Sequence, residues 1–585
     1  MGGRRVADQP DRTGAGRLPG LAGKRRGLTS TIAGAAGLIA VLTVLARIVG
    51  FGRVFVFSGT VGFNRVGDIY QTVNTIPNVV FEIVAGGALA SVVVPLLSAA
   101  VTRRDHAEVN RVASALLTWT VTVLTPLAVL VAVSAGPLVR LMLGADATPA
   151  DLDFGRLLLV IFAPQLVLYG VGLVLAGTLQ AHHRFAGPAL APLLSSLTVI
   201  GAYLVYAAVG GAPNPAGLSR TAELVLAVGT TLGVVVLSLS LLVPLSRTTV
   251  RLQPTYRFPA GVPVRVRRLV GSGVAAVVGQ QAALVVVLLL AQPPAPEGSV
   301  VAYTVAMTVF LLPWGVLAVP LATAVFPRLA SAFDRGDRAG YDRSLRVATH
   351  SVILVTAAAA AALLAAARPI GTIVTAVGNG AGSTAAVTGA IAAFAPGLPG
   401  YGLLALLTRA LYAAGAARSA AVVTLGGWAV VIIADIALAA SLPENERVPA
   451  LAAGHTIGMT LLGVALLALA AHRVGRTALV GVPRVAVCSV VAGAVAALVG
   501  SSVAGLLPGD GVPAVVGQGL LAGVVVLAVF AAVVAALDRR QLRPLVRELA
   551  ARVARRSGSE QEPADGGPKV APREDTRQQP TDEEA

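Results

Sequence analysis

The sequence is dominated by apolar runs of about 20 residues that carry no charge, separated by short polar segments. An α-helix needs about that length to cross roughly 30 Å of hydrocarbon. Hydrophobic residues make up 56% of the 585 positions and charged residues only 12%, far from the composition of a soluble globular protein. The runs therefore predict a chain that lies in a lipid bilayer.

We predict an all-α integral membrane protein with fourteen transmembrane helices. The loops between the runs are short, so no large domain outside the membrane is expected. The first apolar run has no small-residue cleavage site, so we interpret it as a span and not as a removable signal. The predicted spans are residues 30–56, 69–101, 112–139, 157–180, 188–209, 221–245, 269–292, 299–327, 349–367, 382–408, 419–441, 449–471, 485–507 and 514–537.

An internal repeat organises these spans. Residues 89–111 align without a gap to residues 321–343, with ten identities in twenty-three positions, at an offset of 232 residues. The offset equals six spans, so both copies keep the same orientation, as in transporters built from parallel repeats around a central cavity. The predicted parts are a disordered tail (1–28), two six-helix bundles (29–250 and 265–475), two additional helices (482–538) and a basic then acidic tail, mostly disordered (539–585).

Lysine and arginine predict the orientation of the chain. They concentrate in the even-numbered loops, which places both termini in the cytoplasm. This topology and the basic tails account for the formal net charge of +17, and anionic membrane lipids are the expected partners of the basic loops. Nucleic-acid binding is the competing reading of so basic a chain, but cytoplasmic loops explain the charge without it.

One helix face in the second span is polar. At 100° per residue, five side chains fall within an arc of roughly 120°. Charged groups are costly in hydrocarbon, so such a face usually lines a wet cavity or meets polar partners. The pattern predicts a polar path through the membrane, lined by Asp68, Gln71, Asn74, Asn78 and Glu82.

Two arginines lie in the first span, with two glycines between them that loosen the helix. Arg47 and Arg53 need anions in an apolar setting, and the candidates are Asp68 and Glu82 or a bound phosphate or diphosphate, whose oxygens suit the guanidinium fork. The alternative is that each arginine extends to a lipid headgroup from near a span end.

The remaining polar residues within spans carry less information. Gln165, Tyr169, Gln280, Gln281 and Trp314 are expected to form hydrogen bonds between helices. Asp435 is a lone carboxylate that could hold a coupling cation or a proton, or make a structural pair. Cys488 is the single cysteine, and no enzyme signature, cofactor site or metal site emerges.

Several blocks of the sequence resemble one family. They are ARIVGFGR (46–53), IPN (76–78) followed by GGALASVVVPLLS (86–98), LQAHHRFAGPALAP (179–192), PWGVLAVPLATAVFPRLA (313–330) and LLTRALYAAGAARS (406–419). In this order they are similar to the motifs of the MurJ/MviN lipid II flippases, in the multidrug/oligosaccharidyl-lipid/polysaccharide exporter superfamily. The resemblance implies a fourteen-helix alternating-access carrier in the bacterial plasma membrane. Its cargo would be the undecaprenyl-diphosphate-linked peptidoglycan precursor.

The resemblance also bears on individual residues. Arg47, Arg53 and Asp68 match charged positions of the family. Phe81 and Glu82 stand where the family usually has two arginines, and Thr308 replaces an arginine of the eighth span. The cavity is therefore expected to be less cationic than the family pattern.

Together these observations favour a flippase and not an enzyme. Arg47 and Arg53 would hold the diphosphate, Asp68 and Glu82 would orient them or close the gate, and the substrate-binding amides Asn74 and Asn78 would meet sugar hydroxyls. Two alternatives stay open. The cargo could be another lipid-linked glycan or an amphiphile, or the chain could be a non-transporting scaffold for cell-wall synthesis proteins.

Overall fold

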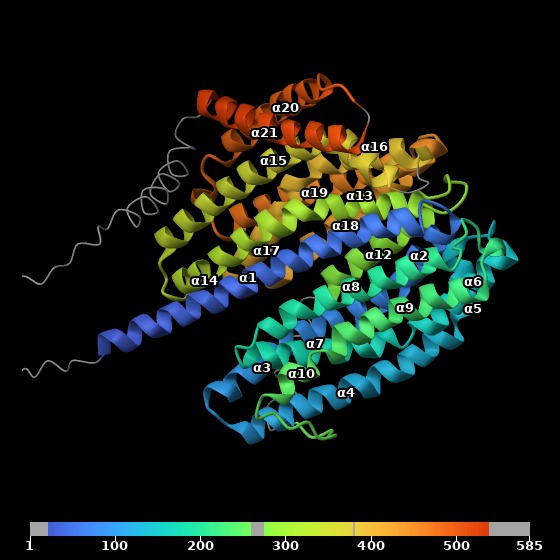
Figure 1. The fold of residues 1–585 in the computed structure, drawn as a ribbon. Helices are drawn as coiled ribbons and strands as arrows, with labels where there is room; N and C mark the ends of the chain where they lie inside the picture. The colour runs from blue at the N-terminus through green and yellow to red at the C-terminus, as the bar shows by residue number, and fades with distance from the viewer. Residues whose placement is uncertain (1–20, 259–273, 378–380, 510, 538–585) are drawn as a thin grey trace, which may run out of the picture. The chain divides into compact units, whose positions relative to one another are not determined.

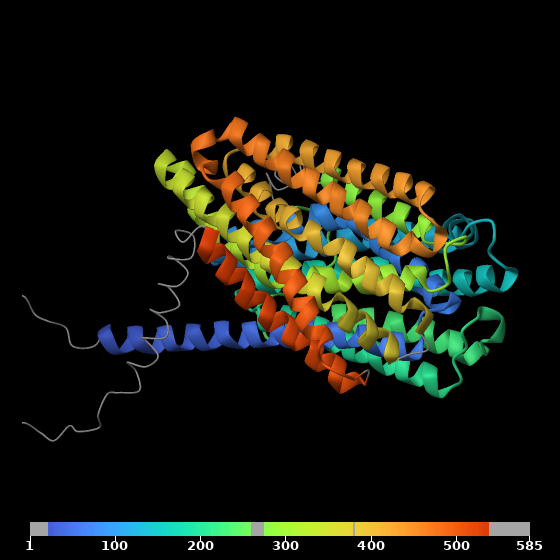
Figure 2. The same cartoon turned by 90° about the horizontal axis from the view of Figure 1, so that it is seen from above.

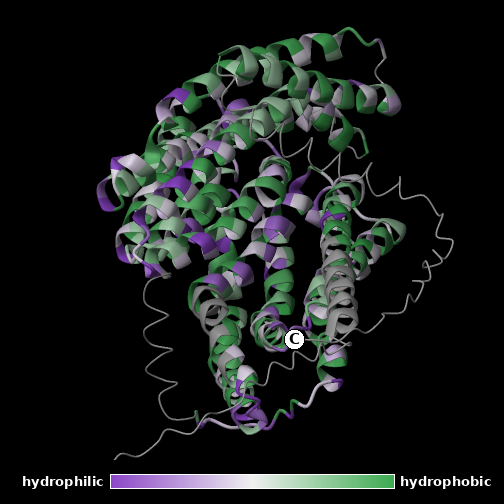
Figure 3. Cartoon of the chain, turned by 90° about the vertical axis from the view of Figure 1, so that its left-hand side faces the viewer, coloured by the Kyte–Doolittle hydropathy of each residue, from purple (hydrophilic) through white to green (hydrophobic). Residues whose placement is uncertain are grey.

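The computed structural model describes residues 21–258, 274–377, 381–509 and 511–537, and every regular element in these ranges is a helix (Figure 1). Contacts divide the chain into one unit of residues 1–530 and a short unit of residues 531–585, of which the described part is the end of the last helix. The features below belong to the first unit. Hydrophobic residues cover most of the helical surface (Figure 3).

The helices fall into two consecutive sets, which we call the first half and the second half. The first half contains α1 (Leu21–Thr60), α2 (Arg65–Phe81), α3 (Gly87–Thr102), α4 (His106–Val133), α5 (Ala135–Leu143), α6 (Pro149–Phe162), α7 (Gln165–Ala181), α8 (Ala186–Ala208), α9 (Arg220–Leu239) and α10 (Leu242–Ser246). The second half contains α12 (Val274–Leu290), α13 (Ser299–Pro313), α14 (Val319–Asp334), α15 (Arg338–Ala376), α16 (Thr384–Phe394), α17 (Leu398–Ala413), α18 (Ala417–Ser441) and α19 (Arg447–Arg473), and is followed by α20 (Val482–Gly505) and α21 (Val512–Leu537).

The predicted all-helical membrane fold is confirmed. Twelve helices in the described ranges are long and apolar enough to cross a bilayer. The other two predicted spans, 69–101 and 269–292, fall on the interrupted helix α2–α3 and on the shorter α12, so a count of fourteen is compatible with the structure. Helix α1 begins at Leu21, inside the segment predicted as a tail, whereas residues 1–20 and the tail 539–585 lie outside the described residues.

Each half packs mainly on itself. In the first half α8 contacts α1 and α9, α7 contacts α3 and α4, and α2 contacts α6. In the second half α19 contacts α16, α17 and α18, and α12 contacts α18, while α20 lies along α15 (Figure 2). The main direct contact between the halves is that of α2 with α13. The bundle boundaries predicted from the repeat stay predictions.

Two π-helices interrupt the equivalent spans of the repeat. The segment η1 (Glu82–Gly86) separates α2 from α3, and η3 (Trp314–Ala318) separates α13 from α14. Glu82 and Trp314 are 232 residues apart, which is the offset of the sequence repeat. A π-helix inserts one residue into a turn and often marks a functional site, so the repeat has kept the same interruption in both halves.

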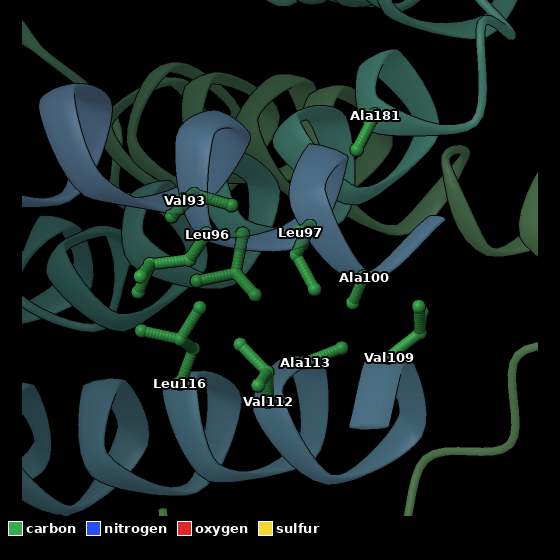
Figure 4. Close-up of a cluster of buried hydrophobic side chains, with 10 residues drawn as sticks. Val93, Leu96, Leu97, Ala100, Val109, Val112, Ala113, Leu116 and Ala181 are labelled. Carbon is green, nitrogen blue, oxygen red and sulfur yellow. The ribbon is translucent and has the colours of Figure 1, made fainter. Parts of the chain in front are cut away.

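The α3–α4 hairpin closes one end of the first half. Side chains spaced three or four residues apart on α3 interlock with those of α4 and α7 (Figure 4). The cluster contains Val93, Leu96, Leu97, Ala100, Val109, Val112, Ala113, Leu116, Val174 and Ala181.

An extended segment after α10 runs along α4. The N–H groups of Arg251, Gln253 and Thr255 donate to Asn110 Oδ1, Ser114 Oγ and Thr118 Oγ1 at 3.0, 3.0 and 3.1 Å. Every second residue of an extended chain advances about 6.6 Å and every fourth residue of a helix about 6.0 Å, which explains why the two periods match.

Candidate functional site

A cavity of about 260 Å³ lies between α1, α2, α7, α8, α9 and α13. Polar side chains from both halves line it, and Arg53 is the one charged group among the described residues that do so. Phe57, Val199 and Val234 form apolar parts of the wall. The polar lining consists of Arg53, Tyr70, Gln71, Asn74, Asn78, Tyr169, Ser195, Tyr203, Thr230, Thr304 and Thr308.

Helix α2 supplies the polar face that the sequence predicted, but over a shorter length. Gln71, Asn74 and Asn78 line the cavity, and Asn78 Nδ2 donates to the Asn74 carbonyl at 2.8 Å. Glu82 lies beyond them in η1, about half exposed and outside the cavity wall. The π-helix changes the phase of the helix at that point, so the fifth residue of the stripe leaves the face shared by the other members.

Three hydroxyl groups that the sequence analysis missed form the floor of the cavity. Tyr70 Oη lies 2.9 Å from both Tyr203 Oη and Thr230 Oγ1. The ring of Phe57 packs against the rings of Tyr70 and Tyr203. These residues come from α1, α2, α8 and α9, and no spacing along the chain indicates that they meet.

The two arginines of the first span do not converge. Six residues separate them, which places their side chains about 120° apart around the helix. Arg53 points to the cavity, whereas the exposed Arg47 lies against η3, where a Cβ on Gly315 would be 3.2 Å from Arg47 Nη1. Within the described ranges neither arginine forms an ion pair, so the predicted pairing with Asp68 or Glu82 is wrong for this conformation.

Asp68 joins the two halves. Its side chain is 3% exposed, and its two oxygens accept hydrogen bonds from the N–H groups of Gly298 and Val301 at 2.7 and 3.0 Å. These groups belong to the first turn of α13, where N–H groups lack partners within the helix and the helix dipole favours an anion. Asp68 therefore caps α13 and does not orient the cavity arginine.

A buried network extends this contact. Arg65 Nε lies 3.1 Å from Asp151 Oδ2, and Arg65 Nη1 donates to Gln292 Oε1 at 3.1 Å. Gln292 Nε2 in turn donates to Thr72 Oγ1 at 3.0 Å. We call the set Arg65, Asp68, Thr72, Asp151 and Gln292 the α2–α13 lock. Arg65 and Gln292 border predicted spans and resemble ordinary loop residues, so sequence reasoning missed them.

Other polar residues within spans have separate places. Gln165 Nε2 donates to Thr231 Oγ1 at 2.8 Å, and Trp314 Nε1 donates to the Tyr401 carbonyl at 3.2 Å, so both form the expected bonds between helices. Asp435 lies on α18, fully buried and away from the central cavity. The described residues contain no group of three His, Cys, Asp or Glu that could hold a metal ion.

Comparisons with known proteins agree on one family. The family model described as lipid II flippase MurJ matches residues 57–517. A probable lipid II flippase MurJ from Synechocystis sp. is 29% identical over 217 residues, which cover 37% of this chain and 40% of the relative. One from Rhizobium tropici is 26% identical over 298 residues, 50% of this chain and 54% of the relative. These alignments span about half or less of the relatives' length.

Solved structures of low sequence identity share the fold. A lipid II flippase MurJ in an inward closed conformation has a TM-score of 0.69 at 17% identity, covering 86% of this chain and 100% of that chain. An inward-facing multidrug resistance MATE transporter of the MOP superfamily has a TM-score of 0.62 at 14% identity, covering 74% and 94%. The MurJ family comprises multi-pass membrane transporters of the bacterial inner membrane and not enzymes. Since the family model matches well over half of the sequence, the chain belongs to the lipid II flippase MurJ family.

Proposed function

We propose that the protein moves lipid II, the undecaprenyl-diphosphate-linked peptidoglycan precursor, from the inner to the outer leaflet of the bacterial plasma membrane. The observation that carries this proposal is the cavity between the halves, in which one guanidinium stands among neutral hydrogen-bonding groups. An anionic, sugar-bearing headgroup needs this combination to leave water.

The cavity chemistry divides between charge and hydrogen bonding. Arg53 would bind diphosphate oxygens through its planar fork of N–H groups. Gln71, Asn74 and Asn78 would meet sugar hydroxyls, because an amide both donates and accepts. A volume of about 260 Å³ is small beside typical ligand pockets, so the cavity has to widen to admit a disaccharide-peptide headgroup.

Arg47 would act before the cavity. It lies at the contact between α1 and η3, on a different side of α1 from Arg53. A phosphate entering between these two elements would meet Arg47 first and then Arg53. Glu82, half exposed in η1, would repel an anion outside the cavity wall and so favour entry towards Arg53.

The α2–α13 lock would close one side of the cavity during alternating access. With both termini in the cytoplasm, as the lysine and arginine distribution predicts, the N-terminal ends of α2 and α13 face outwards, so the lock would hold the outer side shut. Rocking of one half against the other would break these bonds, and η1 and η3 would be the points at which α2–α3 and α13–α14 bend. Anionic lipids at the basic loops and cell-wall synthesis proteins would be the partners.

To test the proposal, the chain is expressed in a host depleted of its own flippase, and lipid II in the outer leaflet is measured. We expect wild type to restore exposure of lipid II, Arg53→Ala to reduce it more than tenfold, and Arg53→Lys to recover part of it. Arg111→Ala, which removes an exposed arginine of α4, is the matched control and should behave as wild type. No restoration by a well-expressed wild-type chain would contradict the flippase, and full activity of Arg53→Ala would favour a scaffold.

A second cargo is favoured by one observation. The cavity wall holds a single charge, with Thr308 where the family pattern has an arginine. A lipid with a monophosphate linkage or a neutral amphiphile would need less positive charge than a diphosphate. Measuring the flipping of each lipid class in vesicles that contain the purified chain separates the two cargoes.

A further inference from the structure

A second polar cavity lies inside the second half. It has a volume of about 180 Å³ and is lined by residues of α12, α13, α17, α18 and α19. His455 forms part of its wall, is 3% exposed, and leaves Nε2 without a hydrogen-bond partner in the described structure. A buried polar group without a partner costs free energy, so its presence calls for a function.

Aromatic rings surround His455 on several sides. The rings of Phe310, Phe394, Tyr401 and Trp428 have centroids 5.8, 5.5, 5.8 and 5.8 Å from the imidazole. The faces of such rings are electronegative and attract a cation within about 6 Å. The cage therefore accommodates His455 both as a neutral ring and as a protonated one.

Asp435 lies beside this cage. It is 0% exposed, and neither carboxyl oxygen has a hydrogen-bond partner in the described structure. Its side chain packs on Gly454, the residue before His455, so closely that a Cβ at Gly454 would collide with Asp435 Oδ1. A partnerless carboxylate in apolar surroundings costs several kcal/mol, so this packing suits a carboxylic acid.

The groups facing the pair from neighbouring helices offer no permanent counter-ion. Tyr303 of α13 lies within electrostatic reach of Asp435, and Tyr401 of α17 lines the cage. Gln280 of α12 and Phe394 of α16 do not titrate. Arg447 donates to the Ala439 carbonyl, one turn along α18 from Asp435, and forms no ion pair in the described ranges.

Helix α13 connects the pair to the central cavity and to the lock. Tyr303, Met307 and Leu311, spaced by four residues, face the His455 cavity, whereas Thr304 and Thr308 face the central cavity. The first turn of the same helix is held by Asp68. A change of packing around His455 therefore reaches both through one rigid helix.

We propose that Asp435 and His455 form a proton-binding site whose occupancy controls the α2–α13 lock. The inference rests on the proposed function only for the use of this control in transport. The bound proton is held as the O–H of Asp435. On release that O–H bond breaks, the lone pair of His455 Nε2 accepts the proton, and the imidazolium then passes it to water at the exposed side of the cavity near Gln280.

The direction of the effect follows from the burial of Asp435. The locked conformation tolerates the neutral acid but not a partnerless carboxylate, so it is favoured while the proton is bound and disfavoured as pH rises. Asp435→Asn resembles the protonated acid in shape and charge, so this variant should stay locked at every pH.

The test follows opening of the lock in the full chain without any cargo. Cys488 is replaced by alanine and Ser195, in the central cavity, by cysteine. The protein is reconstituted in oriented vesicles, and the rate of labelling by a membrane-impermeant maleimide is measured from the outer side between pH 5.5 and 8. The rate is divided by that of a Ser502→Cys variant, whose exposed thiol corrects for the pH dependence of the reagent.

We expect the corrected rate to rise about fivefold with pH in the parent and to stay at its low-pH value in Asp435→Asn. His455→Phe keeps the aromatic packing, so it should retain both end points but respond about tenfold more slowly to a pH jump. His472→Gln, on the exposed end of α19, should match the parent. A parent rate that ignores pH, or that changes when choline replaces sodium at constant pH, would overturn the proton site. Because no cargo is present, failure of the flippase assay leaves this result standing.

Discussion

Helices α2 and α13 occupy equivalent places in the repeat but carry opposite chemistry. With the offset of 232 residues, Gln71 corresponds to Tyr303, Asn78 to Phe310 and Glu82 to Trp314. The face that lines a polar cavity in the first half packs in an aromatic cage around His455 in the second. The comparison teaches that the duplication preserved the backbone, including the π-helix, while side chains decided which half holds water.

The largest effect is expected at Asp68, whose equivalent in α13 is the apolar Val300. Asp68→Ala leaves the N–H groups of Gly298 and Val301 buried without acceptors, at a cost of about 1–3 kcal/mol each. We expect transport to fall more than tenfold and outside labelling of the cavity to increase. Asp153→Ala, at an exposed position of α6, should change neither, and an unaffected Asp68→Ala protein would show that the lock does not control the outer side.

A slightly smaller effect is expected when α2 is made to resemble α13. Asn78→Phe introduces the residue of the equivalent position 310 and fills part of the cavity with an apolar ring. Transport should drop about tenfold, while the melting temperature of the purified protein stays within a few degrees of wild type. Asn78→Gln keeps the amide and should retain most of the activity. Normal transport by Asn78→Phe would mean that the cargo does not use this face.

The reverse exchange should act on stability. Phe310→Asn places an amide in a dry cage, so we expect a loss of about 2 kcal/mol in the free energy of unfolding, seen as a lower melting temperature. Phe310→Leu, which removes the ring but adds no polar group, should lose less. If the asparagine variant melts as the wild type does, the second half is wetter than the aromatic packing indicates.

The smallest effect concerns the two π-helices. Trp314→Phe removes the hydrogen bond to the Tyr401 carbonyl but keeps an aromatic ring, so a loss of about 1 kcal/mol is expected. Glu82→Gln, at the equivalent half-exposed position, should leave the melting temperature unchanged. Equal destabilisation by both variants would contradict the idea that only η3 is tied to a neighbouring helix.

Much of the cavity could be predicted because it depends on local periodicity. Gln71, Asn74 and Asn78 recur at helical spacing in an apolar segment, so one helix alone indicates a polar face. His455 could not be found in this way. A single histidine in an apolar span has no partner at a fixed spacing, and its cage comes from four helices.

The sequence by itself determined that the chain is a helical membrane protein built from a repeat, because apolar length and periodicity are properties of neighbouring residues. The tertiary structure alone decided what each charge meets. Asp68 caps α13 instead of pairing with an arginine, Arg47 and Arg53 separate around α1, and Arg65 reaches Gln292. Such pairings depend on helix rotation and on contacts between residues more than 200 positions apart, and a linear pattern records neither.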